Sequence, residues 1–164
     1  MGKIAIITGI RGQDGTYLSK LLLKKNYKVI GISNPKNKSK IKLNKVNVKS
    51  IDLNNFKKIS ELIRKTKPNE IYHLAAQSFI NYKFEDEFFK LNPNINGTHY
   101  ILSSIKKYSP ETKFYFAASS EIFGDAKNYP QNEKSEFNPR SAYGISKVAG
   151  FHLTKNYREA YNLF

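Results

Sequence analysis

The chain of 164 residues contains no cysteine and no tryptophan, and it has a single methionine. The absence of cysteine excludes disulfide bonds and thiolate metal sites, and no paired histidine or carboxylate spacing indicates another metal site. A reducing compartment is compatible with this composition, so we expect a cytoplasmic protein. No apolar run approaches the ~18 residues that a membrane span needs, and no signal-peptide pattern precedes the first apolar run. We therefore expect no membrane partner.

Acidic residues are scarce, because 13 Asp and Glu stand against 28 Lys and Arg, giving a formal net charge of +15. Such a charge favours nucleic acids or other anionic partners. The lysines are nevertheless scattered among asparagines and isoleucines, and their densest cluster, residues 36–49, lies between two expected strands. We interpret the excess as a composition bias that helps to attract an anionic nucleotide, and we expect no nucleic-acid partner. The alternative, a basic nucleic-acid binder, predicts that duplex DNA stays bound at high salt.

The chain does contain an alternation of strand and helix patterns. Strands are expected at residues 4–7, 28–32, 46–51, 70–74 and 114–118, and helices after the first strand (Tyr17, Leu18, Leu21 and Leu22 on one face), along Phe56, Ile59, Leu62 and Ile63, and over residues 94–108 and 141–161. Pro93 suits the first turn of the third helix, with Asn92 as its cap. This alternation predicts an α/β fold, a Rossmann-like doubly wound parallel sheet with helices on both faces, formed by one domain over residues 1–164. Because such a sheet normally continues with another strand, we expect an incomplete domain whose C-terminal substrate part is missing.

A glycine turn organises the start of the chain, between the first strand and the first helix. Its glycines are spaced Gly9-x-x-Gly12-x-x-Gly15. In a dinucleotide site, Gly9 permits the tight turn, Gly12 lets the backbone approach a pyrophosphate, and Gly15 lets the helix pack on the sheet. Glycine turns also occur for structural reasons alone, but the flanking strand and helix favour phosphate binding at the helix N-terminus.

The end of the second strand predicts which dinucleotide is bound. No acidic residue stands at positions 32–38 to hold the ribose 2′-hydroxyl of NAD, whereas Arg11 and Lys36 are cations suited to the 2′-phosphate of NADP. We therefore expect NADP, although Lys36 and Lys38 also fit ordinary solvated loop charges. After the third strand, Asp52 is placed to bind an adenine amino group with Leu53 against the ring; a helix cap at Asp52 is the alternative.

Tyr143 and Lys147 carry the clearest chemical signal. Their four-residue spacing puts both on one helix face, where an ammonium favours ionisation of a phenol whose pKa is otherwise near ~10. Tyr143 is then suited to take a proton from a sugar hydroxyl, and Ser119 completes the proton-transfer site. Glu121 is suited to move protons at carbon and at a leaving hydroxyl, with a surface loop acid as the alternative. We interpret His73 as a core residue.

These motifs together resemble the extended short-chain dehydrogenases that act on sugar nucleotides. The stretches Ile7–Leu18, Leu74–Ser78, Pro139–Tyr143 and Asn156–Tyr161 resemble more closely the GDP-mannose 4,6-dehydratase family. The resemblance implies NADP as cofactor, a nucleotide-sugar substrate, GDP-mannose, and a homo-oligomer for a full-length form. The catalytic residues it implies are Ser119, Glu121, Tyr143 and Lys147. The cofactor-binding residues are Gly9, Arg11, Gly12, Gln13, Asp14, Gly15, Lys36, Asp52, Leu53, Leu74, Ala75, Ala76, Gln77, Ser78, Tyr143 and Lys147.

The implied reaction is an internal redox cycle. Tyr143 deprotonates the 4-hydroxyl as C4 is oxidised, Glu121 abstracts the acidified C5 proton and assists loss of the 6-hydroxyl as water, and C6 is then reduced. The product is GDP-4-dehydro-6-deoxy-mannose, so the enzyme is a lyase. Two alternatives remain open: another nucleotide-sugar epimerase or reductase, in which Glu121 has no elimination to perform, and a truncated NADP-binding module without activity.

The chain also departs from the family pattern. Ser119 replaces the usual threonine, Phe89 replaces a tyrosine, Pro93 interrupts a helix that is normally continuous, and the pair of arginines expected near Asn34 is absent. The family has a further C-terminal part that grips the GDP-sugar. We therefore expect weak or no turnover from these 164 residues alone.

Overall fold

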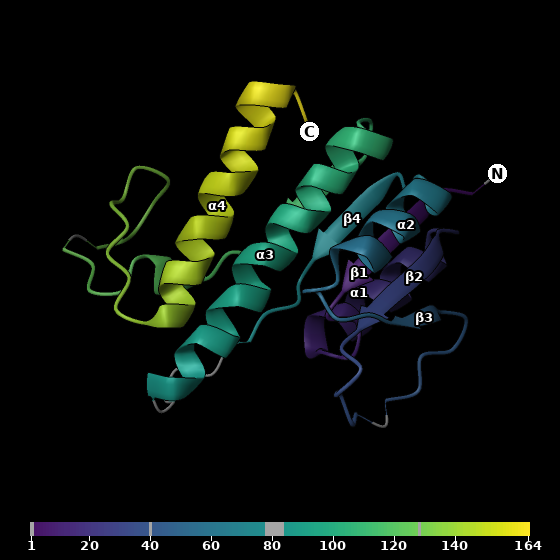
Figure 1. Cartoon of the computed structure of the whole chain (residues 1–164), viewed down its shortest axis with the longest axis horizontal. Helices are drawn as coiled ribbons and strands as arrows, with labels where there is room; N and C mark the ends of the chain where they lie inside the picture. Colours follow the sequence, from purple (N-terminus) through teal and green to yellow (C-terminus); the bar gives the residue numbers. More distant parts are fainter. Residues whose placement is uncertain (1, 40, 78–83, 128) are drawn as a thin grey trace.

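A computed structural model of the chain describes residues 2–39, 41–77, 84–127 and 129–164, with the backbone alone for residues 84–90. Strands and helices alternate along the chain (Figure 1). The elements are β1 (Ile4–Thr8), α1 (Gln13–Lys24), β2 (Lys28–Ser33), β3 (Asn47–Ser50), α2 (Phe56–Thr66), β4 (Glu70–His73), α3 (Phe84–Tyr108), β5 (Lys113–Phe116), the short 3-10 helix η1 (Ser120–Ile122) and α4 (Ala142–Tyr161).

The strands form one parallel sheet in the order β3-β2-β1-β4-β5. Alternate residues of β1 face opposite layers: Ile6 packs in a core with residues of α2, α3 and α4, whereas Ile7 packs in a second core with Leu22 of α1. Helices therefore cover both faces, and α3 and α4 lie side by side (Figure 1). The predicted Rossmann-like fold class is confirmed.

Two helix predictions were wrong. The third helix was expected to begin near Asn94, and Pro93 was expected to interrupt the longer helix that is usual in the family. Instead, α3 begins at Phe84 and continues through Pro93. A proline inside a helix removes a single backbone donor, so it does not by itself end the helix. The apolar face predicted for α1 was wrong at Tyr17 and Leu21, which are 65% and 50% exposed, whereas Leu18 and Leu22 pack against the sheet as expected.

Small residues instead carry the contact of α1 with the sheet. The buried residues of α1 are Gly15, Ser19 and Leu22. A methyl group at Gly15 would lie 2.8 Å from the Cα of Ile10, so the helix backbone approaches the β1 turn more closely than any side chain permits. Tyr17 and Leu21 are thereby left on the outside.

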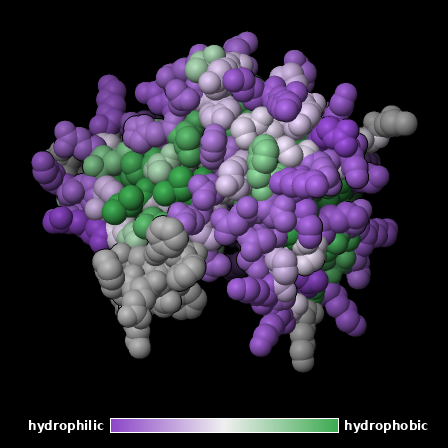
Figure 2. All heavy atoms as spheres, in the orientation of Figure 1, coloured by the Kyte–Doolittle hydropathy of each residue, from purple (hydrophilic) through white to green (hydrophobic). Residues whose placement is uncertain are grey.

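Charge is spread over the surface, and apolar side chains gather locally. Hydrophilic residues cover most of the face shown in Figure 2, and apolar residues gather there over α4. On that helix Ile145 is 51% exposed and Phe151 is 37% exposed. Among the described residues, no helix is both long enough and apolar enough to cross a membrane.

Candidate active site

The glycine turn leaves the N-terminus of α1 open. Gly9 has a φ of +71°, and a methyl group there would lie 2.9 Å from the backbone nitrogen of Ala75. Gly12 is the N-cap of α1 and has no side chain to cap the helix, and a methyl group there would meet only the Gly9 carbonyl oxygen, at 3.2 Å. The first amide groups of α1 therefore face outward without a side-chain partner, which is the arrangement that binds phosphate.

A cavity of about 310 Å³ lies beside this turn, at the carboxyl ends of β1, β2, β3 and β4. The sheet's connections diverge from β1 in both directions, so the cavity occupies the position where open α/β sheets bind ligands. Its wall is formed by Gly9, Arg11, Gly12, Ile32, Ser33, Asn34, Asn37, Ile51, Asp52, Leu53, Leu74, Ala75, Ala76, Gln77, Pro93 and Asn94.

Most of the expected cofactor residues lie on this wall, but several do not. Gln13, Asp14, Gly15, Lys36, Tyr143 and Lys147 are outside it, and Ser78 and the side chain of Phe89 lie outside the described residues. The wall residues that were not expected are Ile32, Ser33, Asn34, Asn37, Ile51, Pro93 and Asn94. Ile32 and Ile51 stand at strand ends, and this position could have indicated that they line the cavity. Asn94 comes from α3, and no local sequence pattern places that helix against the cavity.

Arg11 joins the cavity wall to the long polar loop after β2. Its Nη1 donates to the carbonyl oxygen of Ile41 at 2.8 Å and to that of Ser39 at 3.2 Å. Ser33 and Asn34, at the end of β2, lie on the same wall. Lys36 is exposed and does not reach the wall. Arg11 is thus the cation on this wall.

Asp52 does not cap α2. Its Oδ1 accepts from the backbone nitrogen of Asn54 at 2.9 Å, within the turn that precedes the helix. The N-cap is Asn55, whose Oδ1 accepts from the backbone nitrogen of Lys58 at 3.0 Å. The capping alternative for Asp52 was therefore wrong, and its carboxylate borders the cavity together with Leu53.

Tyr143 and Lys147 are adjacent on α4, as their spacing predicts. Lys147 is 3% exposed, and its Nζ donates to the carbonyl oxygen of Ala117 at 2.7 Å. The same nitrogen lies 5.7 Å from the centroid of the Tyr143 ring and 4.8 Å from that of Phe116. Burial lowers the pKa of the Lys147 ammonium to about 8.

Glu121 contacts the start of the same helix, and Ser119 contacts Glu121. Ser119 is the N-cap of η1, and its Oγ accepts from the backbone nitrogen of Glu121 at 3.3 Å. The Oγ of Ser141 donates to Glu121 Oε2 at 3.3 Å and accepts from the backbone nitrogen of Gly144 at 3.0 Å. Ser141 therefore caps α4 and also contacts Glu121, the expected acid. The sequence did not indicate this contact.

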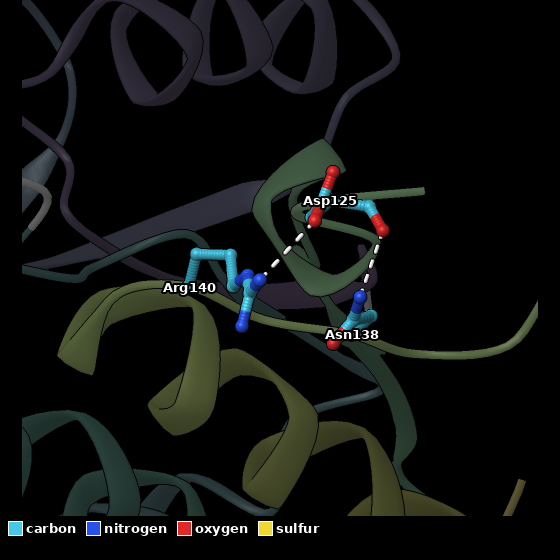
Figure 3. A network of polar contacts seen from close by, with 3 residues as sticks. All are labelled: Asp125, Asn138 and Arg140. Carbon is cyan, nitrogen blue, oxygen red and sulfur yellow. Dashed lines mark hydrogen bonds and ion pairs between the residues drawn. The ribbon is translucent and has the colours of Figure 1, made fainter. Parts of the chain in front are cut away.

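The loop between Glu121 and α4 closes on itself. Arg140 Nη2 donates to Asp125 Oδ2 at 3.1 Å, and Asn138 Nδ2 donates to the Asp125 carbonyl oxygen at 2.7 Å (Figure 3). Gly124 has a φ of +46°, and its backbone approaches the Asn138 carbonyl so closely that a side chain would collide with it. Through these contacts the loop that follows β5 and η1 leads back to the start of α4.

This arrangement agrees with a family match. Residues 6–164 match the model of the family described as GDP-mannose 4,6 dehydratase. The chain belongs to the GDP-mannose 4,6-dehydratase family. It is 38% identical to the GDP-mannose 4,6 dehydratase of Drosophila melanogaster, over 99% of this chain and 45% of that protein. It is 37% identical to the human protein of the same name, over 100% of this chain and 49% of that protein.

Solved structures agree on the fold. The UDP-glucose 4-epimerase of Brucella ovis, solved with NAD, matches with a TM-score of 0.89 and 22% identity, over 99% of this chain and 50% of that one. The UDP-glucose 4-epimerase of Thermotoga maritima, solved with UDP-glucose, matches with the same TM-score and identity. The chain of this dehydratase-family member thus spans about half the length of the curated relatives and solved structures that it matches.

Proposed function

We propose that this chain binds NADP and carries the catalytic groups for the dehydration of GDP-mannose to GDP-4-dehydro-6-deoxy-mannose. The main support is the convergence of Glu121, Tyr143 and Lys147 on the first turns of α4, with Ser141 contacting Glu121 and the helix backbone. Membership of the dehydratase family agrees with this arrangement. An acid beside a tyrosine–lysine pair is what an elimination adjacent to a temporary ketone requires.

The cavity residues fit a dinucleotide. The Gly12 backbone and the open N-terminus of α1 suit a pyrophosphate, and a side chain at Gly9 would collide with Ala75 across the turn. At the end of β2 the wall offers Arg11, Ser33 and Asn34 with no carboxylate, so we propose NADP rather than NAD. Asp52 and Leu53 are proposed to hold the adenine. When bound, the nicotinamide supplies the reversible redox step that lets oxidation at C4 and reduction at C6 cancel.

The residues of this chain are proposed to move the protons. Tyr143, with the Lys147 ammonium beside its ring and assisted by Ser119, takes the proton of the 4-hydroxyl. The resulting 4-ketone acidifies the C5 hydrogen, which Glu121 removes as a proton. Glu121 then delivers this proton to the departing 6-hydroxyl, which leaves as water. When C6 is reduced, a proton is added at C5, and this balances the proton that Tyr143 took from the 4-hydroxyl. The hydroxyl of Ser141 holds the Glu121 carboxylate at the N-terminus of α4 between these steps.

The test begins with separate titrations of the chain with NADP and NAD. We expect NADP to bind more tightly, and a preference for NAD would contradict the 2′-phosphate argument. The chain loaded with NADP is then incubated with GDP-mannose, and formation of the 4-keto sugar is measured against UDP-glucose as control. We propose that turnover by these 164 residues is weak, because the matched relatives are about twice as long. Robust dehydration of GDP-mannose would overturn the proposal of weak turnover. Formation of the 4-keto product from UDP-glucose but not from GDP-mannose would overturn the proposal that GDP-mannose is the substrate.

Self-association is a further part of the proposal. Apolar side chains gather over α4 (Figure 2), and Ile145 and Phe151 of that helix are exposed, which supports a homo-oligomer formed through α4. Sedimentation of the wild type and of an Ile145→Glu variant tests this, and equal monomeric profiles would contradict it. The expected cytoplasmic location stays a prediction, which imaging of a tagged protein in its host checks.

A further inference from the structure

A chain of buried polar groups runs beneath the cavity. Thr8 at the end of β1 and Thr98 in α3 are 0% exposed, and His73 at the end of β4 is 1% exposed. The Nδ1 atom of His73 lies 2.8 Å from Thr8 Oγ1, and its Nε2 lies 3.1 Å from Thr98 Oγ1. The imidazole therefore bridges a strand of the sheet and a helix that packs on it.

The surrounding contacts assign every proton in this chain. Thr98 Oγ1 donates its single proton to the carbonyl oxygen of Asn94 at 2.8 Å, so toward His73 it accepts, and Nε2 carries the imidazole proton. Nδ1 is then an acceptor, to which Thr8 Oγ1 donates, while Thr8 Oγ1 accepts from the backbone nitrogen of Ala75 at 3.1 Å. Both ring nitrogens of His73 and both hydroxyl protons, of Thr8 and Thr98, therefore have a partner.

Both ends of this chain reach the candidate active site. Ala75 lies on the cavity wall, and so does Asn94, whose Oδ1 accepts from the backbone nitrogen of Gln77 at 2.9 Å. Asn94 Nδ2 also donates to Ser146 Oγ at 3.0 Å. Ser146 Oγ in turn donates to the carbonyl oxygen of Tyr143 at 2.7 Å. One network thus joins the wall segment after β4 to the helical turn that carries Tyr143.

We propose that His73, fixed as its neutral Nε2–H tautomer, is a positioning residue that holds the Ala75–Gln77 segment and helix α4 at one spacing through Thr8, Thr98 and Asn94. The role of the held segment as a cofactor wall rests on the proposed function. A buried histidine with both nitrogens bonded also fits a purely stabilising role. The two roles make different predictions. If His73 positions the cavity wall, removing the Thr98 hydroxyl, on the other side of the imidazole, disturbs the Ala75–Gln77 segment.

The charge state of His73 agrees with this role. Burial, together with the nearby Lys147 ammonium, lowers the pKa of His73 to about 3. The imidazole is therefore neutral at physiological pH, and its Nδ1 lone pair stays available to Thr8. A protonated imidazole would lose that acceptor and would repel Lys147.

The first experiment compares Thr98→Val with Thr98→Ser. Thr98 lies outside the cavity wall, and the valine variant keeps its shape while removing its hydroxyl. We expect Thr98→Val to speed hydrogen exchange of the Ala75 and Gln77 amides about tenfold and to raise the Kd for NADP about tenfold, whereas Thr98→Ser stays within about twofold of the wild type. Lower thermal stability of Thr98→Val with unchanged exchange and unchanged Kd would overturn the positioning role.

The second experiment needs no variant. Nitrogen-15 spectra of the histidine side chains in the wild-type chain are expected to show His73 as the neutral Nε2–H tautomer, and an Nδ1–H tautomer or a charged ring at neutral pH would overturn the proposal. Failure of the proposed function is recognised separately, because the wild type then binds neither NADP nor NAD. Amide exchange and the tautomer still decide the role of His73 in that case.

Discussion

The ammonium nitrogen of Lys147 lies 5.7 Å from the centroid of the Tyr143 ring. Its hydrogen bond to the Ala117 carbonyl oxygen holds it there, at the carboxyl end of β5. The buried ammonium thus has a hydrogen-bond acceptor and an aromatic neighbour, and the pKa of Lys147 falls to about 8 because burial disfavours its charge. Lys147, a proposed catalytic residue, therefore also makes the free energy of unfolding depend on pH.

Replacing Lys147 by methionine should change how stability depends on pH. Between pH 8 and 10.5 the unfolded chain binds a proton at Lys147 that the folded chain has lost, so the free energy of unfolding rises with pH across this window. The rise is on the order of 3 kcal/mol, from the shift between the two pKa values. Urea unfolding at a series of pH values should show this rise in the wild type and its loss in Lys147→Met; parallel curves would contradict the assignment.

Removing the acid should separate catalysis from cofactor binding. Glu121→Gln is expected to abolish the weak formation of the 4-keto sugar, because glutamine cannot accept or deliver the C5 and 6-hydroxyl protons. The Kd for NADP should stay within about twofold, since Glu121 is not on the cavity wall. Ser141→Asn and Ser141→Asp serve as a matched pair that both cap α4, but only asparagine can still donate to Glu121. Equal activities of these two variants would show that the Ser141–Glu121 contact has no catalytic effect.

Arg11 offers a test of cofactor choice. Arg11→Ala should raise the Kd for NADP about tenfold or more and the Kd for NAD only about threefold, because the guanidinium is proposed to pair with the 2′-phosphate. Arg11→Lys keeps the charge but replaces the planar guanidinium, whose Nη1 donates to the carbonyl oxygens of Ser39 and Ile41, by a single ammonium. Equal losses for both dinucleotides in Arg11→Ala would instead mean that Arg11 acts only by holding the loop. Calorimetric titration with each dinucleotide provides the measurement.

The glycines of the first turn should fail in different ways. A methyl group at Gly15 would lie 2.5 Å from the Gly9 carbonyl oxygen, so Gly15→Ala must displace α1, and we expect a loss of ~1–3 kcal/mol in the free energy of unfolding. A methyl group at Gly12 meets that oxygen at 3.2 Å, so Gly12→Ala should fold with little loss of stability. It should nevertheless weaken NADP about tenfold by blocking the backbone approach of the pyrophosphate. Denaturant curves and titrations on both variants check this, and the reverse ranking would contradict it.

His73 predicts an acid-dependent loss of stability. Its pKa is about 3 in the folded chain against 6.5 for the unfolded residue, so below pH 6.5 the unfolded state binds the extra proton. The stability that His73 contributes is complete above pH 6.5 and falls by ~1.4 kcal/mol per pH unit as the pH drops toward 3. His73→Leu should be less stable at neutral pH, with a shallower acid slope. An identical slope in wild type and variant would show that His73 does not titrate in this window.

Local patterns were enough to predict the strands, the glycine turn and the spacing of Tyr143 and Lys147. Each depends on residues within a few positions of one another, whose periodicity or steric freedom acts over one turn or one strand. The start of α3 was not predictable in this way, because Pro93 has the residue type of a helix start but lies inside a longer helix. The outward position of Tyr17 was missed because the close approach of Gly15 to Ile10 decides which face of α1 is buried.

The sequence by itself therefore determined the order of the elements, the parallel sheet and the residue types of the cofactor turn, since these follow from periodicity and from the freedom of glycine. Only the tertiary structure decided that Arg11 contacts Ile41, that Ser141 contacts Glu121, and that His73 joins β1 to α3. The partners in these contacts are distant along the chain. They meet because the parallel sheet carries its strand ends to one edge and the helices packed on it bring their polar side chains to that edge.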